Sequence, residues 1–224
     1  MSVADPTLRL ERAMHREGVR FVIGCDEVGR GAIAGPVAIG LSVVGHGVKA
    51  HPKGLRDSKM LSEKRREELA PLAQTWSQFS AVGLATADEI DRIGIIAALG
   101  LAGRRALIEL HELGVAIHES VVLLDGKHDY LTPALTKPPR VHLRVKADRD
   151  CASVAAASVI AKVHRDRLMI DADDELPGYG WRGNKGYGST EHYAGLDALG
   201  PSALHRHTWL PARPQTLFDP ESAG

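Results

Sequence analysis

The order of strand-like and helical runs constrains the fold of this 224-residue chain more than any other feature. Five short runs have the β-branched content and turn-rich borders of strands, at 20–25, 37–44, 78–85, 120–124 and 141–146. Helices are predicted at 62–74, at roughly 88–113, at 151–175 and in a short segment after residue 190. Three strands, a long helical section, two strands and a helix predict a mixed α/β fold with helices packed on a central sheet. This pattern leaves the strand order open.

Local patterns refine this architecture. A short glycine-rich loop joins the first two strands and leaves no room for a crossover helix, so they should pair as a hairpin or lie as near neighbours. The first 18 residues predict a helix, with Asp5 as N-cap, Pro6 at its first position and Gly18 as its end. Ala and Ser at the start of 151–175 predict a helix packed closely against a sheet or another backbone.

The length fits a single domain spanning 1–224. Within it we expect the N-terminal helix at 1–18, a small helical C-terminal part at about 175–210 and a flexible tail at 211–224, rich in proline and polar residues. A monomer is the default expectation.

Composition excludes several classes of protein. The sequence has no secretory signal and no run of about 18 apolar residues, so we expect a cytoplasmic protein without a membrane span. The two cysteines, Cys25 and Cys151, form no CxxC pair, which excludes a zinc or disulfide framework and predicts reduced thiols. If both flank one site, their oxidation would perturb it. The net charge of +0 neither indicates nor excludes a nucleic-acid binder, because binding to nucleic acid depends on how the charges are distributed over the surface.

Four acidic residues follow three of the predicted strands. Asp26 and Glu27 follow FVIGC, Asp125 follows SVVLL and Asp148 follows VHLRVKA. Ligand sites in α/β sheets form beyond the carboxyl ends of strands, so these acids converge if the strands lie side by side. Converging carboxylates raise one another's pKa, and a hard divalent cation such as Mg²⁺ or Mn²⁺ relieves the repulsion. Two such ions make a site for phosphodiester cleavage, where one generates hydroxide and the other steadies the leaving oxygen.

An ordinary alternative exists for each acid taken alone, because an acid at a strand end is often a turn residue or a helix N-cap. Four acids together, two of them adjacent, weaken that alternative. Asp150 and Asp166 are better explained as helix-cap and ion-pair residues, since Asp166 lies between two arginines in a helical run.

A glycine-rich turn, Gly29-Arg30-Gly31, follows the first pair of acids. Glycines let backbone N–H groups approach a ligand closely, and Arg30 adds a permanent cation near a scissile phosphate. The glycine spacing also resembles a dinucleotide-binding loop. That alternative is weak, because Pro36 stands where a helix should already run and the two acids would repel a pyrophosphate.

Basic residues could line a nucleic-acid groove beside the acids. Segment 137–167 carries an excess of Lys and Arg over Asp, which is usually a solvated face but here could form one wall: Lys137, Arg140, Arg144, Lys146, Arg149, Lys162, Arg165 and Arg167. Lys53, Arg56 and Lys59 could form the other wall, and Lys59 is our candidate there for substrate binding.

Two further segments are open to a functional and an ordinary interpretation. The loop at 183–193 offers Tyr187 as a stacking platform for a sugar or base, or else simply enters a helix capped by Ser189 or Thr190. The run 205–207, His-Arg-His, is expected at the surface or in contact with backbone.

Seven segments resemble, in order, the motif set of the bacterial ribonuclease HII family, the type 2 ribonucleases H. They are DEVGRG (26–31), DSKMLSEKRREEL (57–69), LLDG (123–126), KAD (146–148), AAASVIAKVHRD (155–166), NKGYGSTEH (184–192) and LHRHTW (204–209). The resemblance spans roughly 19–211, and DEVGRG after a strand is its most specific element.

This resemblance implies the ribonuclease H fold, a five-stranded mixed sheet flanked by helices with a small helical C-terminal part. It implies an endonuclease that cleaves the RNA strand of RNA–DNA hybrids. It also implies cutting 5′ to ribonucleotides embedded in duplex DNA, which leaves a 3′-hydroxyl and a 5′-phosphate. Matched by position, Asp26, Glu27, Asp125 and Asp148 would hold two Mn²⁺ or Mg²⁺ ions.

The resemblance also assigns substrate contacts. Gly29, Arg30 and Gly31 would read the ribose 2′-hydroxyl, the group that separates RNA from DNA, and Tyr187 would stack on the adjoining deoxyribose. Ser189 and the pair Thr208-Trp209 depart from the residues common in the family, away from the proposed metal ligands.

Other readings stay open beside this one. The family's sliding-clamp motif near the C-terminus is not clearly present, although Gln215 and Phe218 echo one. Rival functions are a non-catalytic hybrid-binding protein and a related carboxylate-metal nuclease with other substrates. The four acids argue against the first rival, and Arg30 and Tyr187 argue against the second.

Overall fold

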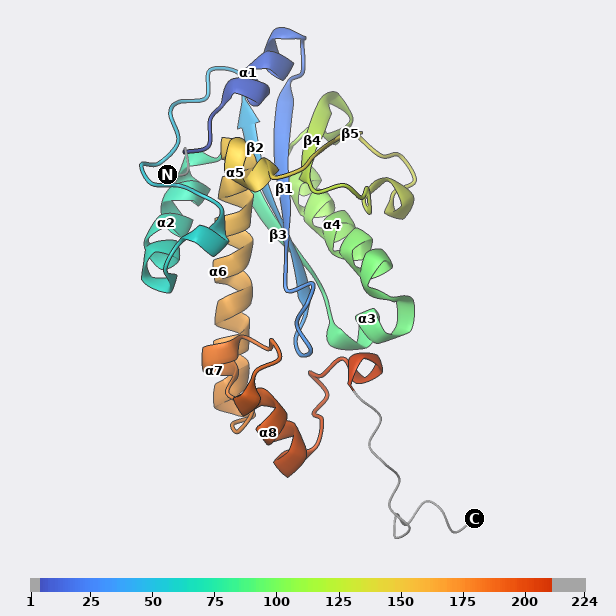
Figure 1. Cartoon of the computed structure of the whole chain (residues 1–224). Helices are drawn as coiled ribbons and strands as arrows, with labels where there is room; N and C mark the ends of the chain where they lie inside the picture. The colour runs from blue at the N-terminus through green and yellow to red at the C-terminus, as the bar shows by residue number, and fades with distance from the viewer. Residues whose placement is uncertain (1–4, 211–224) are drawn as a thin grey trace.

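A five-stranded mixed sheet forms the centre of the molecule (Figure 1). The computed structural model describes residues 5–210. In the spatial order β3-β2-β1-β4-β5, the strands are β1 (Phe21–Val28), β2 (Val37–Gly45), β3 (Phe79–Ala85), β4 (Ser120–Asp125) and β5 (Arg140–Arg144). β1 and β2 pair antiparallel, which confirms the predicted hairpin, whereas β1, β4 and β5 run parallel. The predicted fold class is confirmed.

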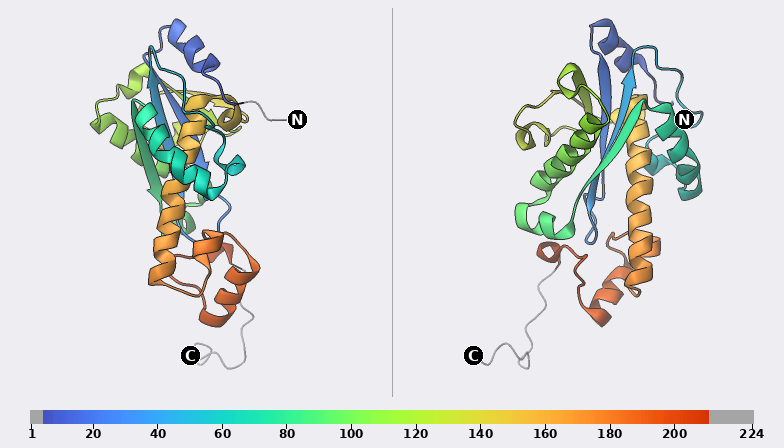
Figure 2. Two further views of the ribbon diagram at one scale, coloured as in Figure 1. Left: turned by 90° about the vertical axis from the view of Figure 1, so that its left-hand side faces the viewer. Right: turned by 180° about the vertical axis from the view of Figure 1, so that it is seen from behind.

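Helices cover both faces of the sheet (Figure 2). They are α1 (Arg9–Arg16), α2 (Glu63–Trp76), α3 (Ala87–Ile93), α4 (Ile95–Glu112), α5 (Ala147–Asp150), α6 (Ala152–Glu175), α7 (Trp181–Asn184) and α8 (Thr190–Leu199). Short 3-10 turns stand at Ser58–Met60, Ile117–Glu119, Thr132–Ala134 and His207–Trp209. Within residues 5–210, no helix is long and apolar enough to cross a membrane.

Alternate residues of β2 show how the two faces are filled. Ile39, Leu41 and Val43 belong to the main hydrophobic core with α4. On the other face, a Cβ added at Gly40 would lie only 2.4 Å from the Ala157 carbonyl oxygen of α6. The small residues of α6 therefore allow its backbone to approach the sheet directly, as the sequence predicted. This contact fixes α6, and α5 before it, against the strands that carry the acids.

The N-terminal helix is shorter than predicted. It begins at Arg9, with Leu8 in the N-cap position, and not at Pro6. Asp5 is not the cap, because it accepts a hydrogen bond of 3.0 Å from Arg56. The residues before the helix instead run alongside the α5–α6 junction, far away in the sequence.

Two other boundaries differ because of single residues. The helix predicted at 88–113 is divided into α3 and α4 by Gly94, whose φ of 78° no helix accommodates. β5 ends at Arg144 and not at 146, because Lys146 has a left-handed conformation with φ 61° and is the N-cap of α5.

The C-terminal part is helical, as predicted for about 175–210. It holds α7, α8 and the 3-10 turn at 207–209, and α7 was not predicted. Ser189 caps α8 by accepting a 3.1 Å hydrogen bond from the His192 backbone, which decides between the two predicted caps. The tail predicted at 211–224 lies outside the described residues.

Candidate active site

Parallel pairing of β1 and β4 brings two of the predicted acids side by side. Cys25 lies opposite Leu124, so Asp26 and Asp125 are the next residues on neighbouring strands. Asp125 Oδ1 accepts a 2.7 Å hydrogen bond from the Ala147 backbone, which joins the end of β4 to α5. Glu27 follows on β1 and the buried Asp148 lies on α5. The structure thus places all four acids on adjoining elements near the carboxyl end of β4.

Burial and repulsion from neighbouring acids raise the pKa of Asp26, Glu27 and Asp148. Burial raises the pKa of Asp26 well above its ordinary 3.8, and the neighbouring Glu27 adds to the shift. Burial also raises the pKa of Glu27, while the cation Arg30 acts in the opposite direction. For Asp148, burial and then Asp125 raise the pKa to about 6. The cluster is therefore unfavourable as a set of bare carboxylates.

One carboxylate oxygen in this cluster is buried without a partner. Asp26 Oδ1 accepts a 2.9 Å hydrogen bond from the Glu27 backbone. Asp26 Oδ2 has no hydrogen-bond partner among residues 5–210. Ser158 lies close enough to lower the pKa of Asp26, but its hydroxyl donates to Ser58 Oγ at 2.9 Å. A buried oxygen of this kind is costly unless a cation or donor satisfies it.

Two side-chain cations lie against the other acids. Arg30 Nη1 is 3.8 Å from Glu27 Oε1, and Lys59 Nζ is 3.8 Å from Asp148 Oδ2. In the described part of the chain, no three His, Cys, Asp or Glu side chains are grouped so that they could hold a metal ion. The hard oxygen donors and the unpartnered Asp26 oxygen fit a divalent cation, which would attract Glu27 and Asp148 away from Arg30 and Lys59.

The glycine turn rests on two buried arginines. Arg206 donates hydrogen bonds to the carbonyl oxygens of Gly29 (2.7 Å), Arg30 (3.0 Å) and Gly35 (3.1 Å). Arg165 donates hydrogen bonds to the carbonyl oxygens of Ala34 (3.1 Å) and Pro36 (2.7 Å), which follow the turn. Both guanidinium groups are fully buried, and neither has an ion pair within 5–210. Burial lowers the pKa of Arg206 to about 10. These cations fix the course of the turn.

These arginines test two predictions. Arg165 was expected on a wall of a nucleic-acid groove, which is wrong because the side chain is buried beneath the turn. Arg206 was expected either at the surface or in contact with backbone. It is buried and contacts backbone. A sequence signal existed for Arg165, because Ala157, Ala161, Arg165 and Met169 recur every four residues and all lie on the buried face of α6.

The loop that carries Tyr187 is hydrogen-bonded to the residues that directly follow the glycine turn. The Gly186 carbonyl accepts hydrogen bonds from the backbones of Ile33 (2.9 Å) and Ala34 (3.0 Å). The half-buried Tyr187 ring lies 5.4 Å from the Arg165 guanidinium and 5.8 Å from Lys162 Nζ. Tyr187 therefore stands beside the turn, as the proposed substrate contacts require.

Ion pairs explain other charged residues. Asp150 pairs with Arg144 at 2.6 Å, and Asp166 pairs with Lys162 at 2.6 Å, so both acids have the structural role predicted for them. Asp166 does not pair with the two arginines that flank it in sequence. Arg167 pairs with Glu67 instead, which removes another cation from the predicted basic wall.

The two cysteines are both buried, in different hydrophobic clusters. Cys25 is buried in the main core, and Cys151 is buried in a separate cluster. Burial raises the pKa of the Cys25 thiol well above its usual value and that of Cys151 to about 12. Asp125 is among the charges that act on both thiols, so the hypothesis that their oxidation perturbs the site stays a prediction.

Comparisons with known proteins agree with this architecture. The family model described as Ribonuclease HII matches residues 23–212. A Ribonuclease HII of Streptomyces griseus is 44% identical over 213 residues, which cover 93% of this chain and 86% of that protein. The crystal structure of ribonuclease H2 from Pyrococcus horikoshii OT3 superimposes with a TM-score of 0.64 and 26% identity, over 84% of this chain and 93% of that one. Bst-RNase HIII in complex with Mn²⁺ gives a TM-score of 0.69 and 25% identity, over 88% of this chain and 69% of that one.

The extent of these matches confirms the resemblance found in the sequence motifs. The family model covers most of the chain, and the relative is similar over nearly the whole of it. The solved ribonucleases H share its fold. The chain accordingly belongs to the ribonuclease HII family, and it is an endoribonuclease that hydrolyses phosphodiester bonds.

Proposed function

We propose that this endoribonuclease cleaves the RNA strand of RNA–DNA hybrids and cuts 5′ to ribonucleotides embedded in duplex DNA, leaving a 3′-hydroxyl and a 5′-phosphate. The observation that carries the proposal is the meeting of Asp26 and Asp125 on parallel strands, with Asp26 Oδ2 buried and unpartnered. That arrangement lowers the stability of the bare protein, and a cationic cofactor would reverse the effect.

Asp26, Glu27, Asp125 and Asp148 would hold two Mg²⁺ or Mn²⁺ ions. Bst-RNase HIII, which has the same fold, was solved in complex with Mn²⁺, and this supports a need for divalent metal. When bound, such ions activate the attacking water and stabilise the leaving oxygen. The protein's part is orientation: the Ala147 N–H holds one oxygen of Asp125, which fixes the direction of the other.

The glycine turn and Tyr187 would recognise the junction between RNA and DNA. Arg30 has a side chain 45% exposed beside Glu27, suited to a phosphate, and the turn presents backbone groups suited to a 2′-hydroxyl. Tyr187 would stack on the deoxyribose next to the ribonucleotide. Lys59, whose side chain is 71% exposed, would contact a phosphate near Asp148.

A cleavage assay tests this proposal. The substrates are labelled duplex DNA carrying one ribonucleotide and an all-RNA/DNA hybrid, each with magnesium, manganese or chelator. We expect metal-dependent cutting 5′ to the lone ribonucleotide and its loss in Asp125→Asn. Asp88→Asn is the matched control, because Asp88 is an exposed acid of α3 whose one ion pair among residues 5–210 is with Arg92.

Two results would contradict the assignment. Binding of both substrates without cleavage would favour the non-catalytic hybrid-binding protein. Cleavage that persists in Asp125→Asn would show that the acids are not the metal ligands.

The remaining expectations are not tested by the described residues. The clamp contact expected at Gln215 and Phe218 lies outside residues 5–210 and stays a prediction, as do the single domain, the monomer and the cytoplasmic location. A pull-down of a sliding clamp with and without Phe218→Ala tests the first, and equal recovery would remove the idea.

A further inference from the structure

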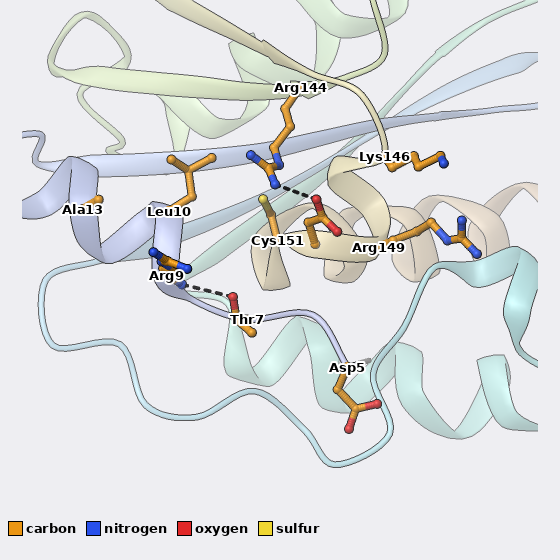
Figure 3. Close-up of a pocket in the computed structure, with 10 residues that line it drawn as sticks. Asp5, Thr7, Arg9, Leu10, Ala13, Arg144, Lys146, Arg149 and Cys151 are labelled. Carbon is orange, nitrogen blue, oxygen red and sulfur yellow. Dashed lines mark hydrogen bonds and ion pairs between the residues drawn. The ribbon is translucent and has the colours of Figure 1, made fainter. Parts of the chain in front are cut away.

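A basic groove lies between the N-terminal segment and α5, apart from the carboxylate cluster (Figure 3). Its volume is about 710 Å³, and four of its lining residues are cations: Arg9, Arg144, Lys146 and Arg149. Figure 3 shows that Arg9 stands on the α1 side, whereas the other three stand on the β5–α5 side. Cationic side chains therefore line both sides, or banks, of the groove: the α1 side and the β5–α5 side.

Only part of this charge is neutralised within the protein. Arg144 pairs with Asp150 at 2.6 Å, and the other acid of the groove, Asp5, pairs with Arg56 at 2.8 Å. Among residues 5–210, the three remaining cations have no ion-pair partner: Arg9, Lys146 and Arg149. Three unpaired cations along one groove suit a ligand with several negative charges.

Backbone hydrogen bonds hold the two banks together. The Thr7 N–H donates to the Asp150 carbonyl at 3.0 Å, and the Ala152 N–H donates to the Thr7 carbonyl at 3.0 Å. The left-handed conformation of Lys146 is unusual for a residue with a side chain, and its carbonyl accepts from the backbones of Arg149 (3.1 Å) and Asp150 (3.2 Å). The cations are thus presented by a fixed turn and not by a free loop.

The same turn leads to the carboxylate cluster. Lys146 comes directly before Ala147, which bonds Asp125, and two residues before Asp148. Two residues span at most about 7–8 Å, while a nucleic-acid strand advances about 3.4 Å per nucleotide. A strand with its cleaved phosphate at the acids therefore reaches this turn within about two or three nucleotides.

We propose that this groove binds the sugar-phosphate backbone of the substrate on one side of the cleaved bond. The inference rests on the proposed function, because it assumes that nucleic acid lies across the four acids. Cations on both banks neutralise backbone phosphates and position the strand without reading its bases. The groove thus extends the contact with substrate beyond the reacting phosphate.

The test measures binding separately from cleavage. Affinity for a labelled RNA–DNA hybrid is measured by fluorescence anisotropy in chelator at several salt concentrations, for wild type, Arg9→Ala, Lys146→Gly and the double variant. Glycine at 146 accepts the left-handed conformation, so this variant keeps the turn. Arg104→Ala is the matched control, because it removes the same charge from exposed α4 on the opposite face of the sheet.

Each single groove variant should weaken binding. The slope of the logarithm of the binding constant against the logarithm of the salt concentration is negative, and it should become less steep by about 1 in each single variant and by about 2 in the double variant. Arg104→Ala should change neither. Hybrids shortened on one side or the other of the cleavage site locate the contact. The difference in affinity between wild type and the groove variants should disappear for the hybrid that no longer reaches the groove. It should persist for the hybrid shortened on the other side.

Equal behaviour of the groove variants and Arg104→Ala would overturn the proposal, as would equal losses on both shortened hybrids. Thermal melting shows whether each variant is folded. Cleavage by wild type and its loss in Asp125→Asn test the proposed function separately. If the wild-type enzyme cuts its substrate but the groove variants bind it normally, the proposed role of the groove is refuted and the proposed function is not.

Discussion

Gly29 and Gly31 stand in one turn but face different constraints. Gly29 has a φ of 85°, and a Cβ there would lie 2.1 Å from Arg165 Nε, so the fold itself requires glycine. Gly31 has open space where a Cβ would stand and does not have a positive φ. A need for glycine at 31 would therefore come from the approach of substrate to the backbone.

Gly31→Ala should separate stability from activity. We expect the free energy of unfolding to stay within about 0.5 kcal/mol of wild type, because the site is open. Cutting of the ribonucleotide-containing duplex should fall by about tenfold or more in kcat/KM, since a Cβ would intrude on the substrate. Gly183→Ala, another open position, is the control. Full activity of Gly31→Ala would show that substrate does not approach this turn.

Asp26→Asn should make the metal-free protein more stable while abolishing cleavage. Asn keeps the shape and the hydrogen bond from the Glu27 backbone but removes the buried charge. We expect a gain of about 0.5–2 kcal/mol at pH 7 in chelator, measured by urea denaturation. Because burial raises the folded-state pKa of Asp26, the gain should shrink towards pH 4, where the unfolded carboxyl also binds a proton. A loss of stability at pH 7 would contradict this account.

At the scale of elements, Arg206 joins the C-terminal part to the loop between β1 and β2. Arg206→Lys should lower the free energy of unfolding by about 2–4 kcal/mol, because one ammonium group cannot serve carbonyls spread along the loop and leaves some unsatisfied. Cleavage should fall with it, since the turn loses its support. Arg182→Lys, at an exposed ion pair with Asp174, is the control in both measurements. Unchanged stability of Arg206→Lys would mean that the conformation of the β1–β2 loop does not depend on Arg206.

The contact between α8 and the C-terminal segment depends on two neutral histidines. His192 Nδ1 must carry a proton, because it lies 2.9 Å from the Tyr187 carbonyl, which only accepts. His192 Nε2 then accepts from Trp181 at 3.0 Å and from His205 Nε2 at 3.0 Å. His205 Nδ1 accepts from the Ser202 backbone at 2.9 Å. Every ring nitrogen is thus engaged, and a second proton on either ring would break a hydrogen bond.

This pair should make stability depend on pH. Burial lowers the pKa of both histidines, that of His205 to about 4, below the ordinary 6.5. The unfolded chain therefore binds more protons in this range, and the contribution is complete above pH 6.5 and lost as pH falls towards 4. His205→Gln should be less stable than wild type at pH 7.5, by an amount that shrinks at pH 4.5. A Tm difference that does not change with pH would refute this.

At the scale of the whole molecule, metal and protons should compete for the acids. The folded-state pKa of Asp148 is about 6, above its ordinary 3.8, so in the metal-free protein its contribution to stability falls as pH rises between about 4 and 6. Metal requires ionised carboxylates and reverses this trend. At 100 times its Kd, Mn²⁺ should add about 2.7 kcal/mol at pH 7.5 and much less at pH 5.

Thermal melts with MnCl₂ or chelator measure this effect. Asp125→Asn should lose most of the stabilisation, whereas Asp88→Asn should keep it. Equal stabilisation at both pH values, or in Asp125→Asn, would show that the metal binds elsewhere.

Local patterns were sufficient for most elements. All five strands and the long α6 were predicted because β-branched runs, turn residues and helix ends are local signals. The errors fall where one residue or a distant partner decides. Gly94 interrupts an otherwise helical run, Lys146 turns the chain into α5, and Asp5 meets Arg56 instead of capping α1.

The sequence by itself determined which residues we propose for the chemistry, namely four acids at or beyond the ends of three predicted strands and a turn with glycine on both sides of Arg30. Only the tertiary structure decided that Asp26 and Asp125 stand on adjacent parallel strands. It also decided that Arg165 and Arg206 are buried supports of the turn, although a solvated face was the simpler expectation for the segment that holds Arg165. The physical reason is that residue type and spacing set local conformation and chemistry, whereas burial and pairing arise from contacts between segments far apart in the chain.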